Sequence, residues 1–235
     1  MSSDKDTTTT KKKEQQIQFV RPMKAIDVKD IADLKFPLSG TDISLSNTKI
    51  VLLNAPPSAG KDYLADKLQL WYDNISTNEF KAPLYKLVQT IYSISPTIFW
   101  SVYNNRDLKE KKMFVGDTKS IRDLMIEVSE GLIKPYYGRE YFGVIASNTK
   151  PETSLVVYRD CFGDLDEIQP LIDKYGRDNV ICIRIKADGK DFTGDSRRYL
   201  YTDQIECFDI YNDMKTDWYV NATIGILKRK GWLVE

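Results

Sequence analysis

Short apolar runs alternate with helically spaced apolar stripes along most of the chain. Residues 50–53 (Ile-Val-Leu-Leu) are apolar throughout, which is typical of a central parallel strand buried on both faces. Leu64, Leu68 and Trp71 then recur at helical spacing, and Asp73-Asn74 follows as a stop signal. Further along, the pattern predicts strands at 78–81, 154–158, 180–185 and 207–210, and helices at 84–91, 121–128, 139–147, 164–175 and 218–228.

Strands that alternate with helices predict an α/β fold with a mainly parallel sheet and helices on both faces. We assign this three-layer domain to residues 49–235. An aromatic and then strongly charged surface insertion is expected at about 96–118. A small mobile lid is expected at about 187–203, because this stretch contains Gly189 and Gly194 and no apolar run.

The first 48 residues differ in composition from the rest of the chain. Residues 1–16 are almost entirely polar and are expected to form a disordered tail, since they cannot bury enough surface to offset the entropy of ordering. Residues 17–48 have scattered apolar positions between prolines, which indicates an extended leader with a short helix near 28–34.

Charge and composition narrow the chemistry. The chain has 34 Lys and Arg, 34 Asp and Glu, and no histidine. Balanced charge gives no uniform field to attract nucleic acid or an anionic membrane, so we expect neither as a partner. The absence of histidine excludes His-based acid–base catalysis and most zinc sites. The remaining reactions are those that Lys, Arg and carboxylate side chains can catalyse, and phosphoryl transfer is the leading candidate among them.

Three cysteines, Cys161, Cys182 and Cys207, are widely separated, and two of them fall in strand-like runs. This pattern is typical of buried, reduced thiols in a cytosolic protein. No apolar run approaches the length that a bilayer requires, and the N-terminus is polar. We therefore expect a soluble cytoplasmic protein, and leave open whether it forms a homodimer.

The segment Ala55-Pro-Pro-Ser-Ala-Gly-Lys-Asp62 lies directly between the apolar strand and the amphipathic helix. This is the context of a P-loop, in which backbone amides around Ser58, Ala59 and Gly60 wrap a phosphate at a helix N-terminus. The Lys61 ammonium would reach the β and γ oxygens of ATP. Residues 58–63, ending at Tyr63, are the candidate nucleotide-binding residues. A Gly-Lys turn that caps an ordinary helix is the alternative.

Two positions depart from the usual motif. Ala55 replaces the first glycine, which requires its φ to stay negative, and Asp62 replaces the Ser or Thr that normally meets Mg²⁺. A carboxylate is a hard oxygen ligand for Mg²⁺, so Asp62 is a candidate metal ligand. Asp160, at the carboxyl end of the strand 154–158, is a second one. Its alternative role is to cap the next helix.

Arginines occur at helix starts, strand ends and in the polar loop, where phosphate-binding groups are found in such folds. They are Arg122, Arg139, Arg159, Arg197 and Arg198. Each one taken alone is more often a solvated surface residue. Together with the loop before Lys61 they form the candidate phosphate-binding set.

Five segments resemble one family: Gly60-Lys-Asp62 with Ala65-Asp66, residues 80–86 (Phe-Lys-Ala-Pro-Leu-Tyr-Lys), Arg106–Lys109, residues 120–125 (Ser-Ile-Arg-Asp-Leu-Met), and Arg139 with Tyr141-Phe142. They are similar to the bacteriophage deoxynucleoside monophosphate kinases, which are P-loop enzymes of the wider nucleoside monophosphate kinase group. The similarity covers most of residues 49–228. The resemblance implies ATP with Mg²⁺ as donor and a deoxynucleoside 5′-monophosphate as acceptor.

The resemblance also assigns roles. In that family arginines help to bind the phosphates of donor and acceptor, which implies a phosphate role for Arg122 and Arg139. Our own expectation is that these two bind the acceptor phosphate and that Arg197 or Arg198 closes from the lid. Where the family has Gln and a Gly-Thr pair, this chain has Ile126 and Ser129-Glu130, and Phe162 replaces an expected arginine. Two alternatives stay open: a kinase of another small phosphorylated metabolite, and a catalytically weakened nucleotide-binding interaction protein.

Overall fold

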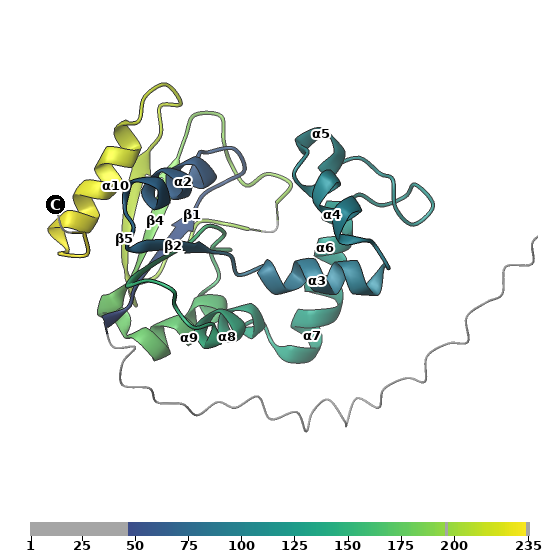
Figure 1. The fold of residues 1–235 in the computed structure, drawn as a ribbon, viewed down its shortest axis with the longest axis horizontal. Helices are drawn as coiled ribbons and strands as arrows, with labels where there is room; N and C mark the ends of the chain where they lie inside the picture. Colours follow the sequence, from purple (N-terminus) through teal and green to yellow (C-terminus); the bar gives the residue numbers. More distant parts are fainter. Residues whose placement is uncertain (1–46, 196, 234–235) are drawn as a thin grey trace, which may run out of the picture. The chain divides into compact units, whose positions relative to one another are not determined.

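Five strands form one parallel sheet in the order β2-β3-β1-β4-β5 within the described part of the chain (Figure 1). The computed structural model describes residues 47–195 and 197–233, which all belong to one compact unit, residues 43–235. The tail and the helix expected near 28–34 lie outside the described residues, as does the leader up to residue 46. The strands are β1 (Lys49–Asn54), β2 (Ile75–Asn78), β3 (Leu155–Tyr158), β4 (Val180–Lys186) and β5 (Glu206–Tyr211).

Helices cover both faces of this sheet (Figure 1). One face carries α2 (Lys61–Trp71) and α10 (Trp218–Arg229). The other carries α3 (Ala82–Ile91), α4 (Pro96–Tyr103), α6 (Ile121–Ile126), the π-helix η2 (Glu127–Ile133), α8 (Tyr141–Asn148) and α9 (Leu165–Tyr175). Short helices α5 (Arg106–Lys109), α7 (Lys134–Tyr137) and η3 (Arg177–Asn179) connect them. The predicted α/β class, with a parallel sheet between two helical layers, is confirmed.

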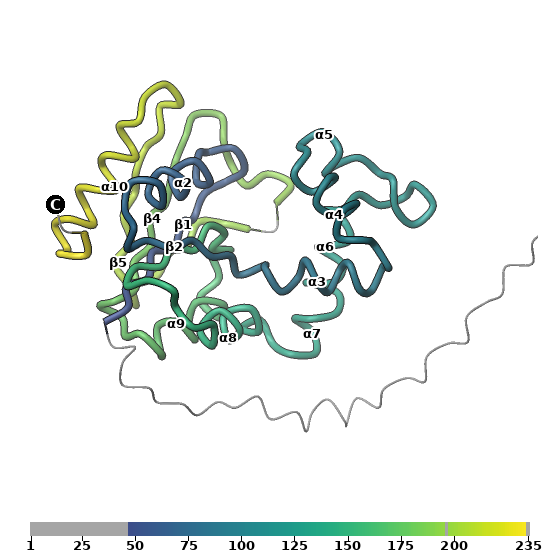
Figure 2. Tube along the Cα trace, in the orientation of Figure 1, coloured from purple at the N-terminus to yellow at the C-terminus, as the bar shows by residue number. Residues whose placement is uncertain are grey.

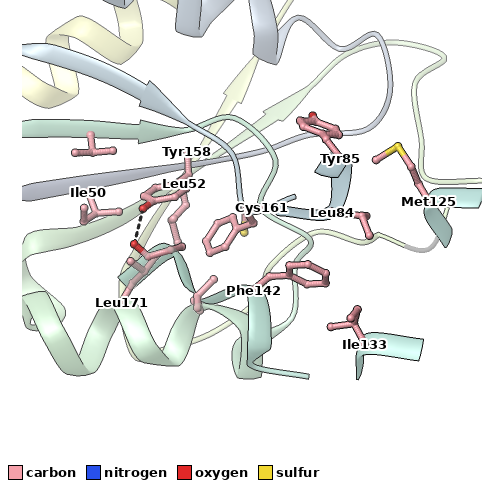
Figure 3. Close-up of a cluster of buried hydrophobic side chains, with 14 of the residues drawn as sticks. Ile50, Leu52, Leu84, Tyr85, Met125, Ile133, Phe142, Tyr158, Cys161 and Leu171 are labelled. Carbon is pink, nitrogen blue, oxygen red and sulfur yellow. Dashed lines mark hydrogen bonds between the residues drawn. The ribbon is translucent and has the colours of Figure 1, made fainter. Parts of the chain in front are cut away.

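The central side chains of β1 are apolar because both of its faces are buried. Successive side chains point to opposite faces of a strand. Accordingly Ile50 and Leu52 pack into the layer with α3, α8 and α9, while Val51 and Leu53 pack against α2 and α10. Figure 3 shows Ile50 and Leu52 beside Phe142, Tyr158 and other members of the first layer.

The strand order creates a topological switch point at β1. The chain leaves β1 toward β2 and β3 on one side, and returns through α9 to β4 on the other side. In open α/β sheets, ligands bind in the crevice outside the carboxyl ends of the strands at such a point. The loop that follows β1 therefore lies where the fold favours a ligand.

Helix starts agree with local capping signals. The Ser120 hydroxyl accepts from the Asp123 amide, and the Asp123 carboxylate accepts from the Ser120 amide, which forms a capping box at α6. Asp164 caps α9 by accepting from the Asp166 amide. The predicted helix 121–128 is longer than expected, because α6 continues directly as η2 up to Ile133.

Strand β2 is three residues earlier than the predicted 78–81. The buried Asp160 carboxylate accepts hydrogen bonds from the backbone amides of Phe80 (2.8 Å) and Lys81 (3.2 Å). Because they donate to Asp160, these amides do not pair with a neighbouring strand, and the chain enters α3 directly after them. The boundary depends on a residue 80 positions away, so periodicity alone misplaced it.

The structure adds detail to two further expected segments. The expected surface insertion at 96–118 contributes to the core, because Phe99 of α4 is fully buried against the layer of α3 and α6. The expected lid is anchored at its end, since Leu200 is buried and its amide donates to the Asn54 side chain at 2.9 Å. Figure 2 shows the segment after β4 running from the sheet toward the helices of residues 96–137. None of the helices in the described ranges is long and apolar enough to cross a bilayer.

We predict that Gly143→Ala destabilises the protein by about 1–3 kcal/mol, which is the usual cost of overpacking. A Cβ on Gly143 would lie 1.8 Å from the Glu167 carbonyl oxygen, so α8 and α9 would have to separate. Gly131→Ala is the matched control, because a Cβ there meets nothing within 4 Å. Urea unfolding measures both variants, and an equal midpoint for the two would contradict this packing account.

Candidate functional site

A cleft of about 680 Å³ opens at the carboxyl end of β1. Its walls come from the loop before α2, the ends of β2 and β3, helices α5 and α6, and the segment after β4. Seven Lys and Arg side chains line it: Lys61, Lys81, Arg106, Lys109, Arg122, Arg159 and Arg197. Six carboxylates line it as well: Asp62, Glu79, Glu110, Glu130, Asp160 and Asp195. The cleft is a candidate anion site where cations lie without a carboxylate partner, as described below for Arg106 and Lys109.

Residues 55–60, here called the β1–α2 loop, turn back on themselves before α2, with the Ala59 amide donating to the Pro56 carbonyl at 3.3 Å. Within the described residues, the amides of Ser58 and of residues 60–62 donate no hydrogen bond. Ser58 has φ 63° and Gly60 has φ 98°, both in the left-handed region. Unpaired amides at a helix N-terminus, beside residues of alternating handedness, form a concave anion-binding surface.

The conformation of this loop is fixed by two residues near the end of β5 and the start of α10, Asn212 and Tyr219. The Asn212 side-chain amide donates to the Ala59 carbonyl (3.0 Å), and the Tyr219 hydroxyl donates to the Gly60 carbonyl (3.2 Å). A Cβ on Gly60 would lie 2.5 Å from Asn212 Nδ2 and 2.8 Å from the Tyr219 hydroxyl. Only glycine fits there, for reasons of both φ and space.

Lys61 and Asp62, the first two residues of α2, form an ion pair at 2.8 Å. The Lys61 side chain is 11% exposed and that of Asp62 is 63% exposed. Although burial opposes ionisation, the nearby cations Lys61, Lys81 and Arg159 hold the pKa of Asp62 below its usual value. A charged carboxylate therefore lies open to the cleft, next to the lysine. Tyr63 points elsewhere, with its hydroxyl bonded to Asp217.

Asp160 lies at the bottom of the cleft and is 1% exposed. Besides the two amides before α3, it lies 3.8 Å from Lys81 Nζ. Burial raises the pKa of Asp160. Burial lowers the pKa of Lys81, but the nearby Asp160 carboxylate raises it, and the net pKa of Lys81 lies above its usual value. Asp160 thus anchors the start of α3 and holds Lys81. The alternative interpretation of the sequence is that Asp160 caps the helix that follows it along the chain. It instead accepts hydrogen bonds from the amides before α3, which precedes it in the sequence.

Arg122 and Arg197 meet over one carboxylate. Asp195, whose side chain is 3% exposed, binds Arg122 at 3.1 Å and Arg197 at 2.5 Å. Burial opposes ionisation, but Arg197 and Arg122 lower the pKa of Asp195 to about 2. Arg122 also pairs with Glu110 at 3.2 Å. The segment after β4 therefore brings an arginine to the cleft and orients the arginine of α6.

Arg139 and Arg198 lie apart from this set. They line an adjoining cavity of about 450 Å³, which shares Glu130 and Phe162 with the main cleft. Arg139 is 68% exposed and pairs with Asp164 at 3.4 Å, and Arg198 donates to the Gly163 carbonyl. The structure thus brings together Lys61, Asp62, Asp160, Arg122 and Arg197, but not the pair Arg122 and Arg139.

Arg159 lines the cleft but is held by its neighbours. It pairs with Asp66 of α2 at 2.6 Å and donates to the Thr77 hydroxyl at 2.9 Å. The interactions link α2 to β2. A ligand would have to compete with them, so we place Arg159 outside the binding set.

Sequence reasoning missed three cleft cations, Lys81, Arg106 and Lys109. Arg106 donates to the Ser58 hydroxyl, and Lys109 lies 3.7 Å from the centre of the Tyr103 ring. Within the described residues neither Arg106 nor Lys109 forms an ion pair. Both lie on α5, three residues apart, which places them on the same face of one helical turn. That spacing was the available signal.

The residues fit a magnesium ion only if a ligand supplies further oxygens. Within the described ranges, no group of three or more His, Cys, Asp or Glu could hold a metal. Mg²⁺ commonly takes one or two carboxylates together with substrate phosphates. Asp62, which is charged and exposed, suits this arrangement, whereas both oxygens of Asp160 accept backbone hydrogen bonds.

Comparison with known proteins gives no relative for this chain: no family model matches the sequence, and no curated protein does. The cleft itself is therefore the basis for inferring function.

We predict that one lysine of the protein titrates at about pH 8. Burial, with the neighbouring charges of Lys81 and Arg122, lowers the pKa of Lys109 to about 8, so its ammonium is charged below that pH and neutral above it. NMR titration of ¹³C-methylated lysines would show the low value, and Lys109→Arg would remove only that signal. Lysines that all titrate near their usual value would contradict the geometry described for α5.

Proposed function

We propose that this protein is a nucleoside monophosphate kinase, which transfers the γ-phosphoryl group of ATP to a deoxynucleoside 5′-monophosphate. The observation that carries the proposal is the β1–α2 loop. The amides of Ser58 and of residues 60–62 have no acceptor in the described chain, and Ser58 and Lys61 line the same cleft as the arginines of α6 and of the segment after β4. Phosphoryl transfer needs a surface that holds two polyanions and stabilises charge moving between them. No other group of residues in the described chain combines these features.

The donor site would be the β1–α2 loop as a P-loop. The amides of Ser58 and of residues 60–62 would hold the β-phosphate, and Lys61 would reach toward the β and γ oxygens. Arg106, which bonds to Ser58, would add a cation from α5. Mg²⁺, held by Asp62, would neutralise charge on the ATP phosphates.

The acceptor site would lie on the other wall of the cleft. Arg122 presents a planar guanidinium suited to a dianionic phosphate, and Asp195 keeps it oriented. Apolar side chains of Leu84, Met125 and Phe162 line the same cavity and suit a base or sugar. Catalysis would be positional and electrostatic, with Lys61, the loop amides and the arginines stabilising the charge that moves between donor and acceptor.

Three differences from the resembled family, Ile126, Ser129 and Phe162, line the cleft, where they would alter acceptor choice. In the donor loop, Ala55 replaces the usual first glycine, and its φ is not positive, so its side chain is tolerated there. This favours a kinase with changed acceptor preference over a weakened protein. A coupled ADP-release assay with each nucleoside and deoxynucleoside monophosphate, and with phosphorylated metabolites, separates the alternatives. Nucleotide binding without any turnover would instead support the interaction protein.

We predict that Lys61→Ala abolishes phosphoryl transfer but leaves the fold intact. Its only ion-pair partner in the described chain is the exposed Asp62, so unfolding without ligand should change little. Mg·ATP should raise the melting temperature of wild type but not of this variant. Lys67→Ala is the matched control on the same helix, since Lys67 stacks over Tyr63 and Trp71 outside the cleft. Full activity of Lys61→Ala would overturn the donor assignment.

We predict that Arg122→Ala impairs use of the monophosphate far more than binding of ATP. A charge-assisted hydrogen bond is worth about 1.5–3 kcal/mol, so kcat/KM for the acceptor should fall roughly ten- to a hundredfold. Arg122→Lys should recover part of the loss, because lysine keeps the charge without the planar fork.

Two arginine variants calibrate this result. Arg177 lies between α9 and β4, outside the cleft, so Arg177→Ala should leave the acceptor kinetics unchanged. Arg139→Ala should have a small effect, because that side chain lines the adjoining cavity. Equal acceptor kinetics in wild type and Arg122→Ala would refute the phosphate role of Arg122.

We predict that Asp62→Ser remains partly active but needs a different Mg²⁺ concentration. Serine restores a hydroxyl ligand and removes one negative charge beside the metal. Activity measured across a Mg²⁺ titration gives the apparent affinity of both proteins. Identical Mg²⁺ dependence would place Asp62 away from the ion.

A further inference from the structure

The three cysteines, far apart in sequence, lie together in the fold. Cys182 of β4 and Cys207 of β5 are direct partners in the register of the two parallel strands. The Cys161 and Cys207 thiols lie near enough to Cys182 to raise the pKa of its thiol. All three are free thiols. Cys161 and Cys182 are buried in the core layer of α9, against which Cys207 also packs, and Cys161 is drawn in Figure 3.

The Cys182–Cys207 pair has the spacing that a disulfide requires. Adjacent strands are about 4.7–4.9 Å apart, and disulfide-bonded residues have Cα atoms about 4.4–6.8 Å apart. Both side chains contact the same core layer, so they point to the same face of the sheet. Cys161 is not a register partner of either one, because it follows β3, and β1 lies between β3 and β4.

The two thiols of the pair differ in access and ionisation. Cys182 is fully buried, whereas Cys207 is half-buried, on the edge strand of the sheet. The neighbouring Cys182 thiol, and secondly the Arg184 guanidinium, lower the pKa of Cys207 to about 7. The neighbouring Cys161 and Cys207 thiols, together with burial, raise the pKa of Cys182. An accessible thiolate beside a protonated buried thiol is the arrangement of an attacking and a resolving cysteine.

We propose that Cys207 and Cys182 form a reversible modification site at which a peroxide oxidises Cys207 and Cys182 closes a disulfide between β4 and β5. In the first step the Cys207 thiolate attacks one oxygen of hydrogen peroxide, an S–O bond forms, the O–O bond breaks, and hydroxide leaves and takes up a proton as water. Cys207 is now a sulfenic acid, oxidised by two electrons.

In the second step the Cys182 sulfur attacks the Cys207 sulfur. The S–S bond forms, the S–O bond breaks, and the departing hydroxide takes the Cys182 proton and leaves as the second water. One peroxide is reduced to two waters for one disulfide. An external dithiol reverses the reaction by thiol–disulfide exchange. The inference depends on the strand register and is independent of the proposed kinase activity.

The test is to treat the folded full-length protein with hydrogen peroxide and map the product by mass spectrometry. Wild type should lose 2 Da, retain one thiol of three after denaturation, and yield a peptide pair joining Cys182 to Cys207 that dithiothreitol separates. Cys161→Ser is the matched control and should give the same cross-link. Cys207→Ser should lose it.

A second variant traps the intermediate. In Cys182→Ala the reaction should stop at Cys207, where dimedone captures the sulfenic acid. If this buried substitution prevents folding, Cys207→Ser and the wild-type map still decide the question. A cross-link to Cys161, sulfinic acid at Cys207 in wild type, or three intact thiols under peroxide that oxidises the unfolded chain would each overturn the proposal.

Discussion

The structure of the cleft depends on one close contact, between Gly60 and the connection of β5 to α10. The left-handed backbone of Gly60, with Asn212 and Tyr219 holding the carbonyls of Ala59 and Gly60, leaves room for no side chain. With these carbonyls held, the amides of Ser58 and of residues 60–62 keep no acceptor within the described chain, and Ser58 and Lys61 line the cleft. The last strand of the sheet thus sets the geometry of a loop that follows the first one.

Buried acids organise the cations around this loop. Asp195 orients Arg122 and Arg197, and Asp160 holds Lys81 while it starts α3. Isolated buried charges are costly, so each acid allows cations to gather in a partly desolvated cleft before an anion arrives. Arg106 and Lys109 lack such partners within the described chain. Burial first, and then the charges of Lys81 and Arg122, lower the pKa of Lys109 to about 8. A polyanionic ligand would reduce the repulsion between these cations.

Sequence periodicity was sufficient for the fold class and for most elements, because apolar spacing is a local property. It placed the helices ending at Trp71 and Tyr175 and the strand beginning at Val180. It failed where a distant residue decides, as with β2, whose end is set by Asp160. Part of the candidate site could be predicted, because motifs indicated the loop and Arg122. Other features depend on strand order and packing, which periodicity does not give. They are the grouping of Arg197 with Arg122, the separation of Arg139, the role of Asn212 and the Cys182–Cys207 pair.

The central claim is that the β1–α2 loop binds phosphate through its own amides. The most direct measurement is a ¹H–¹⁵N NMR titration of the protein with ADP and Mg²⁺, followed at the backbone amides. The account predicts that the largest shifts occur at Ser58 and at residues 60–62, the amides without a protein acceptor. Saturable shifts confined to the adjoining cavity of Arg139 and Arg198, with these loop amides unchanged, would contradict it.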